Sequence, residues 1–137
     1  MIEQIQSPKL LIYSKPDNLN LVEALIEEVK EEHKISEDSY GNMLVAVTEA
    51  VNNAIYHGNG ADPSKKIGIN VEVKGERIAF IIADEGKGFD YYNLPDPTAP
   101  ENIDKPNGRG VFLMKHLADQ LIFSNNGSIV ELHFKIK

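Results

Sequence analysis

Hydrophobic residues recur at helical spacing in two segments of the first half of the chain. Pro16-Asp17-Asn18 looks like a helix start, with Asp17 or Asn18 as the N-cap. Ser36 can cap a second helix that extends to about His57. The apolar sides of these helices are Leu19, Val22, Leu25, Ile26 and Val29 in the first, and Met43, Leu44, Val47, Ala50, Val51, Ala54 and Ile55 in the second.

Other segments have the patterns of β-strands. Residues 2–13 resemble a strand only weakly, and Pro8 limits it to an edge or a bulge. Apolar and polar residues alternate strictly over residues 67–74, which predicts a half-buried strand. Residues 78–83 are continuously apolar, which predicts a strand that is buried on both faces.

The last third of the chain begins with a long loop, from Glu85 to about Asn107, which contains four prolines. Loops of this length are usually functional or mobile. A helix is expected from about Gly110 to Gln120, and a hairpin over residues 121–136 turns at Asn126-Gly127. The predicted fold is α+β, a two-layer sandwich with helices on one face of a mostly antiparallel mixed sheet.

Composition and charge narrow the possible functions. The 137 residues form one expected domain, 1–137. A net charge of −7 argues against binding to a nucleic-acid backbone, although a few local donors could still hold one phosphorylated ligand. The chain has no cysteine, and it has no apolar run long enough to cross a membrane. We therefore expect a cytoplasmic protein.

The second predicted helix carries an unusual polar side, formed by Glu49, Asn52, Asn53, Tyr56 and His57. Asparagine is a poor residue inside a helix, so two in succession suggest a use. A carboxylate and an amide oxygen four residues apart can share one site. The amide oxygen suits Mg²⁺, and the glutamate can act as a general base. An ordinary polar face remains an equally good explanation at this point.

Two glycine-rich turns complete the candidate chemistry. Asp84 follows the continuously apolar strand, where a carboxylate is costly unless a donor such as the amine of adenine pairs with it. Gly108, Arg109 and Gly110 open the third helix, and its exposed N–H groups could bind an anion. Taken alone, the first motif is better explained as an ordinary turn, and the second is a weak signal.

The order of the three motifs is more specific than any one of them. A helix with Glu-x-x-Asn-Asn, a buried strand into Asp-x-Gly-x-Gly and a loop into Gly-x-Gly together resemble the GHKL ATPase family. The Bergerat ATP-binding fold of this family is shared with gyrase and histidine kinases. The resemblance covers nearly the whole chain. A lone domain of this length is most similar to the bacterial anti-sigma factor serine/threonine kinases.

The resemblance implies a role for each matching residue. Glu49 matches the catalytic general base, Asn53 matches the Mg²⁺ ligand, and Asn52 is its neighbour. The nucleotide site would further comprise Asp84 at adenine, Gly86 and Gly88 around the pocket, Gly108, Arg109 and Gly110 at the phosphates, Ser128 in place of a hydroxyl near adenine, and residues 89–107 as the ATP lid.

The resemblance also implies a function. The chain would be an anti-sigma regulatory factor and a serine/threonine protein kinase that uses ATP and Mg²⁺. Its partners would be a STAS-domain anti-sigma antagonist, which it phosphorylates, and a sigma factor, and it would form a homodimer. Two alternatives remain open: a non-catalytic ATP-binding module that sequesters a partner, and a stand-alone histidine-kinase-type catalytic domain.

Overall fold

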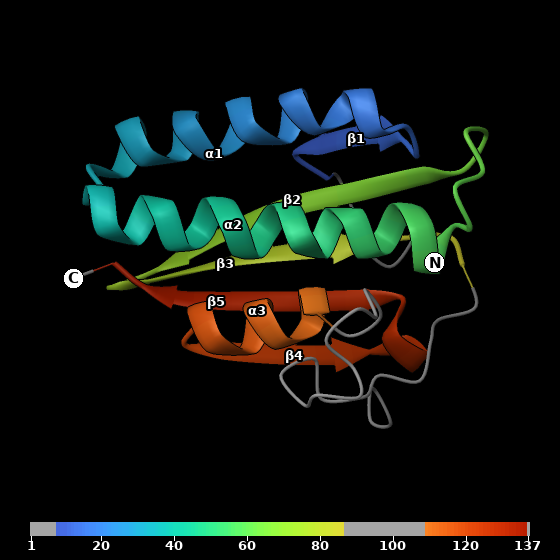
Figure 1. Ribbon diagram of the computed structural model, residues 1–137. Helices are drawn as coiled ribbons and strands as arrows, with labels where there is room; N and C mark the ends of the chain where they lie inside the picture. The colour runs from blue at the N-terminus through green and yellow to red at the C-terminus, as the bar shows by residue number, and fades with distance from the viewer. Residues whose placement is uncertain (1–7, 87–108, 137) are drawn as a thin grey trace.

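Among the residues that the structure describes, one antiparallel sheet and three α-helices make up the architecture (Figure 1). The computed structural model describes residues 8–86 and 109–136. The five strands are hydrogen-bonded in the order β1-β2-β3-β5-β4, and every ladder between them is antiparallel. The strands are β1 (Leu10–Tyr13), β2 (Lys66–Lys74), β3 (Arg77–Ala83), β4 (Gln120–Ser124) and β5 (Ile129–Lys135).

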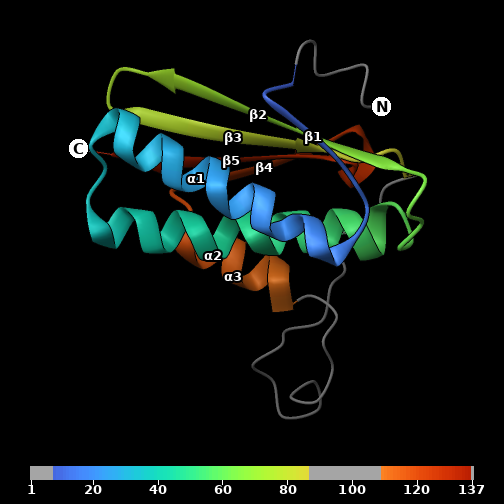
Figure 2. The same cartoon turned by 90° about the horizontal axis from the view of Figure 1, so that it is seen from above.

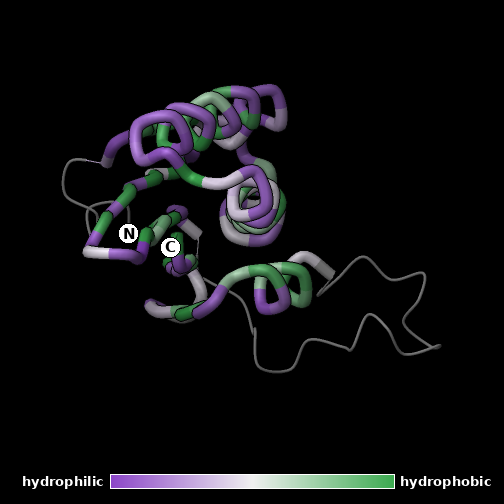
Figure 3. The backbone as a smooth tube through the Cα atoms, turned by 90° about the vertical axis from the view of Figure 1, so that its left-hand side faces the viewer, coloured by the Kyte–Doolittle hydropathy of each residue, from purple (hydrophilic) through white to green (hydrophobic). Residues whose placement is uncertain are grey.

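The helices are α1 (Leu19–His33), α2 (Glu37–Asn53) and α3 (Arg109–Leu117), and α2 continues as a π-helix, Ala54–Gly58. Figure 2 shows α2 and α3 on the same side of the sheet. Hydrophobic and hydrophilic segments alternate along the strands and around the helices in Figure 3, as a two-layer arrangement requires. The predicted α+β sandwich is therefore confirmed, but the sheet formed by the described residues is antiparallel throughout and not mixed. None of the described helices combines the length and the apolar character needed to span a bilayer.

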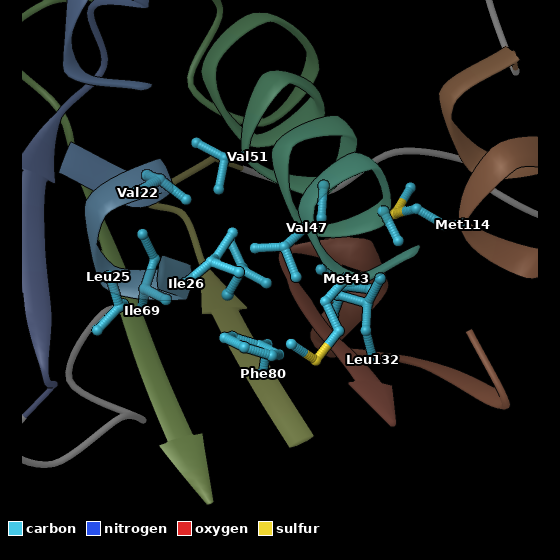
Figure 4. Packing of buried hydrophobic residues seen from close by; sticks show 14 of the residues in the cluster. Val22, Leu25, Ile26, Met43, Val47, Val51, Ile69, Phe80, Met114 and Leu132 are labelled. Carbon is cyan, nitrogen blue, oxygen red and sulfur yellow. The ribbon is translucent and has the colours of Figure 1, made fainter. Parts of the chain in front are cut away.

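The hydrophobic core fills the space between the helices and the sheet (Figure 4). Val22 and Ile26 of α1 are fully buried, and they are joined by Val47 of α2. The sheet contributes Phe80 from the centre of β3, whose ring meets that of Phe134 edge to face at a centroid distance of 6.2 Å. Burying each of these side chains contributes about 1.5–3 kcal/mol, so the sheet and the helices depend on one another.

Strand β3 is buried on both faces, as its continuous apolar pattern predicts. Ile78, Phe80 and Ile82 point into the main core. Ala79, Ile81 and Ala83 form a second, smaller cluster with Ile129 of β5, and each of the four is at most 9% exposed.

The edge strand starts later than predicted, whereas the first helix starts after one of the two predicted cap residues. β1 lies at the edge of the sheet, as Pro8 suggests, but it begins at Leu10. Residues 2–7 of the expected strand lie outside the described residues. A 3₁₀ turn over Pro16–Asn18 precedes α1, and Asn18 makes no side-chain cap. Asn18 is the N-cap residue of α1, as predicted, but its side-chain amide donates to the carbonyl of Tyr13 at 3.0 Å instead of capping the helix.

The second and third helices follow the prediction with one change each. Ser36 caps α2 by accepting a hydrogen bond from the Ser39 amide at 3.2 Å, which confirms the predicted cap. The α-helix then becomes a π-helix before His57. Helix α3 ends at Leu117, because the Asp119 amide donates to the His133 carbonyl and its chain is drawn to the sheet.

The C-terminal end of α1 allows a test of backbone strain. Lys34 follows the helix with φ 53° and ψ 50°, a left-handed conformation that glycine adopts without the steric cost of a Cβ. We expect Lys34→Gly to raise the free energy of unfolding by about 0.5–1 kcal/mol in urea titrations. Glu32→Gly, inside the same helix, is the control and should lower it by about 1 kcal/mol. A destabilising Lys34→Gly would contradict this account of the helix end.

Candidate functional site

The polar side of α2 faces the start of α3. Glu49 and Asn53 lie one helical turn apart and both are half-buried. A Cβ added to Gly110 would lie 2.9 Å from Glu49 Oε2 and 3.3 Å from Asn53 Oδ1. The absence of a side chain at Gly110 therefore lets a carboxylate and an amide oxygen approach the first turn of α3. The N–H groups of that turn carry partial positive charge, which favours anionic groups beside it.

Asp84 lies at the end of β3, where the sequence places it, and it is only 4% exposed. Its backbone N–H donates to the Ser128 carbonyl at 2.9 Å. Its carboxylate accepts a hydrogen bond from the Gly86 amide at 2.8 Å. Burial raises the pKa of Asp84 to about 6, although the Gly86 N–H and the charge of Lys65 act in the opposite direction. This carboxylate can still accept a further donor.

Two glycines allow the Asp84 turn to touch the end of α2. A Cβ on Gly58, the last residue of the π-helix, would overlap the Asp84 carboxylate. A Cβ on Gly86 would overlap the carbonyl of Gly58, so the two backbones are in direct contact. The sequence prediction that Gly86 shapes the site stays a prediction, but the structure gives a steric reason for glycine at this position.

A small pocket with a cavity volume of about 10 Å³, partly open to solvent, lies between Asn53 and Asp84. Its walls are mainly apolar and come from α2, α3 and three strands, while its polar atoms come from few residues. This composition is typical of small-molecule sites. The lining residues are Ala50, Asn53, Ala54, Ile82, Asp84, Met114, Phe123, Gly127, Ser128 and Val130.

The remaining site candidates divide between those near the pocket and those away from it. Ser128 lines the pocket, and its hydroxyl donates to the carbonyl of Asn125 at 2.8 Å. Asn52 is half-buried on α2 but does not line the pocket. Arg109 begins α3. Gly88, Gly108 and the expected lid, residues 89–107, lie outside the described residues.

Sequence reasoning missed several residues that build this site. Asn59 is 2% exposed and its side-chain oxygen accepts from the Glu85 amide at 2.8 Å, directly beside Asp84. Its place before Gly60 is typical of an exposed turn, and no local pattern predicts its burial. Met114 and Phe123 line the pocket from α3 and β4, and only the tertiary fold brings them there. The apolar spacing of α3 was the one available signal for Met114.

Comparison with known proteins gives sequence relatives over most of the chain. The family described as "Histidine kinase-like ATPase domain" matches residues 12–134. Serine-protein kinase RsbW of Oceanobacillus iheyensis is 26% identical over 128 residues, which cover 89% of this chain and 81% of the relative. Serine-protein kinase RsbW of Bacillus subtilis is 24% identical over 127 residues, which cover 88% and 79% of the two chains.

Two solved structures have a similar fold. The crystal structure of the RsbU and RsbW domains of a Mycobacterium tuberculosis protein aligns with a TM-score of 0.60 at 16% identity, over 93% of this chain and 32% of the other. The histidine kinase domain of a blue-light activated histidine kinase from Erythrobacter litoralis aligns with a TM-score of 0.56 at 14% identity, over 88% and 60%. At these identities the likeness concerns the fold.

The raised pKa of Asp84 predicts a pH dependence of stability. The folded pKa of about 6 exceeds the usual value of about 3.9, so the native state holds this proton more tightly than the unfolded state. The contribution of Asp84 to the free energy of unfolding therefore falls as pH rises from about 4 through 6, by up to about 3 kcal/mol.

The measurement compares the wild type with Asp84→Asn in urea titrations between pH 4.5 and 7.5. Asparagine keeps an acceptor for the Gly86 amide but has no proton to lose. We expect the wild type to lose stability relative to the variant as pH rises. Parallel curves for the two proteins would show that the carboxylate titrates normally.

Proposed function

The chain belongs to the histidine kinase-like ATPase family, and we propose that it is an anti-sigma regulatory factor with ATP-dependent serine/threonine protein kinase activity. The resemblance to GHKL ATPases that the three motifs suggest is confirmed by the family match over residues 12–134. The relatives named serine-protein kinase RsbW support the kinase activity and the anti-sigma branch.

The position of Asn53 carries the proposal for the site. Asn53 lines the pocket that contains Asp84, and its side chain also lies against Gly110 at the start of α3. One side chain thus stands between an apolar pocket with a buried acceptor and a helix N-terminus. A nucleotide needs an apolar pocket next to a site for anions, because its base is flat and largely apolar while its phosphates are anionic. We assign the pocket to adenine and the first turn of α3 to phosphate.

Asp84 gives the pocket its proposed preference for adenine. Water barely reaches its carboxylate, so a hydrogen bond donated to it in the pocket is stronger than the same hydrogen bond in solution. The exocyclic amine of adenine is such a donor. Ser128 lines the same pocket, and its carbonyl accepts from the Asp84 amide. Its side chain is proposed as the hydroxyl near adenine. Gly86 lets the turn lie close to the π-helix.

Glu49 and Asn53 would divide the phosphoryl-transfer chemistry. Asn53 Oδ1 is the neutral hard oxygen that Mg²⁺ accepts, and its place beside the phosphate turn fits this ion. Bound Mg²⁺ would neutralise charge on the phosphates. The Glu49 carboxylate would take the proton of a serine or threonine hydroxyl as that oxygen bonds to the γ-phosphorus. The bond from this phosphorus to the bridging oxygen breaks, and ADP leaves.

The proposed partners follow from the family branch. The phosphorylated protein would be a STAS-domain anti-sigma antagonist, and a sigma factor would bind elsewhere on the surface. We also propose a homodimer and the lid role for residues 89–107. The remaining candidates keep their proposed roles. Gly108 and Arg109 would contact the phosphates, Gly88 would shape the pocket, and Asn52 would be the neighbour of the Mg²⁺ ligand.

The first test of this function removes the base. Glu49→Gln keeps the size and hydrogen bonding of the side chain but cannot take a proton. We expect nearly normal ATP binding by calorimetry, with phosphate transfer to a STAS-domain partner slowed by about 10²–10⁴-fold. Glu27→Gln, on the exposed side of α1, makes the same change of charge and should have no effect.

Two results would contradict this assignment. Normal transfer by Glu49→Gln would exclude Glu49 as the base. If the wild type binds ATP but phosphorylates no STAS-domain partner, the non-catalytic binding module becomes the better explanation.

The second test separates a metal ligand from a structural residue. Asn53→Ala should weaken ATP binding in Mg²⁺ by about tenfold and weaken it much less in EDTA, because only the first condition uses the amide oxygen as a ligand. Asn20→Ala, exposed on α1, is the control. An equal loss of affinity in both conditions would show that Asn53 acts only through the fold of the site.

A further inference from the structure

A buried asparagine joins the nucleotide pocket to the edge of the sheet. Asn59 directly follows the π-helix and is 2% exposed. Its Nδ2 donates to Ser14 Oγ at 2.6 Å and to the Lys66 carbonyl at 3.0 Å. Its Oδ1 accepts from the Glu85 backbone amide at 2.8 Å. Both N–H groups and the oxygen of this buried amide are therefore paired, with partners from three separate segments of the chain.

The surrounding bonds close this cluster. Ser14, just after β1, donates through Oγ to the Lys65 carbonyl at 2.9 Å. The Glu85 carboxylate accepts from the Lys66 backbone amide at 2.6 Å. The end of β1, the start of β2 and the residue after Asp84 are therefore held at fixed positions around one side chain.

This arrangement fixes the backbone on both sides of Asp84. The Asp84 amide is bonded to the Ser128 carbonyl, and the next amide, that of Glu85, is bonded to Asn59. The Asp84 carboxylate then has little freedom, because it accepts from the Gly86 amide and packs against the backbone of Gly58. The direction of its remaining acceptor lone pairs depends on these contacts.

We infer that Asn59 is a positioning residue for nucleotide recognition: it holds the Asp84 turn so that the carboxylate faces the exocyclic amine of the base. The inference rests on the proposed nucleotide-binding function. Asparagine suits this place because one acceptor and two donors are needed at the same point. Aspartate would retain the acceptor but turn a carboxylate oxygen toward the Lys66 carbonyl, and alanine would leave the Glu85 amide unpaired.

The test measures the preference for ADP over inosine diphosphate, which has a carbonyl in place of the exocyclic amine. A loss of overall stability affects both ligands equally, whereas a misplaced Asp84 affects ADP alone. We expect Asn59→Ala to lower ADP affinity about tenfold and to change inosine diphosphate affinity less than about twofold. The two affinities are measured by calorimetry at 10 °C.

Ser14→Ala is the matched control. It removes a buried hydrogen bond from the same cluster but leaves the bonds of Asn59 to Glu85 and Lys66 intact. It should lower the melting temperature, as Asn59→Ala does, and keep the wild-type preference for ADP. Asn59→Asp keeps the acceptor for the Glu85 amide and should retain most of the preference despite its lower stability.

Asn59→Asp keeps the inference testable if Asn59→Ala does not fold, because loss of the ADP preference despite the retained acceptor would contradict the role of the Asn59–Glu85 bond. A further variant tests whether the Asp84 carboxylate must keep its place. Gly58→Ala leaves the hydrogen bonds of Asn59 in place but adds a methyl group where the Asp84 carboxylate lies. It should reduce the ADP preference by a similar factor, again with little effect on inosine diphosphate.

The outcomes separate this inference from the proposed function. If the wild type binds neither nucleotide, or binds both equally, the proposed adenine site is wrong. If the wild type prefers ADP and Asn59→Ala prefers it equally, the positioning role is wrong and the adenine site stands. An unchanged preference in Gly58→Ala would instead contradict the assignment of Asp84 to the exocyclic amine. A preference lost equally in Ser14→Ala would also overturn the role of Asn59.

Discussion

The contact between the end of α2 and the Asp84 turn is the constraint on which the site depends. Gly86 meets the carbonyl of Gly58 backbone to backbone, and the Asp84 carboxylate fills the space that a side chain on Gly58 would take. The end of the helix and the turn after β3 are thus in direct contact where the polar groups gather. Close packing of this kind permits little adjustment, since a single added methyl group must displace something.

The π-helix is the local feature that makes this contact possible. Its wider turn gives hydrogen bonds five residues apart, such as that from the Asn59 amide to the Ala54 carbonyl at 2.8 Å. Such turns cost some backbone stability and are frequent at functional sites. Here the π-helix places Gly58 against the Asp84 carboxylate and Asn59 against the Glu85 amide. The geometry of the pocket therefore depends on this distortion of the helix.

Periodicity was enough to predict most of the fold from the sequence. The alternation over residues 67–74 and the continuous run over 78–83 correspond to β2 and β3, because burial on one face or on both leaves different patterns. Spacing also placed Glu49 and Asn53 on one side of α2. It could not reveal that Gly110 lies against them, because that approach depends on tertiary packing. The burial of Asn59 was equally invisible, since two of its three partners, Ser14 and Glu85, are distant in sequence.

The pairing of the strands has a consequence for how the chain folds. β2 with β3 and β4 with β5 are local hairpins, but β1 with β2 and β3 with β5 are long-range pairings. Ser14 and Lys65, which share a hydrogen bond beside β1, are 51 residues apart. Closing a long loop costs entropy that must be offset before its contacts form. We expect both long-range pairings to form after the hairpins, and the cluster around Asn59 to be completed only when β1 docks. The proposed nucleotide site would then be completed late, so that a chain able to bind in the proposed way is one that has finished folding.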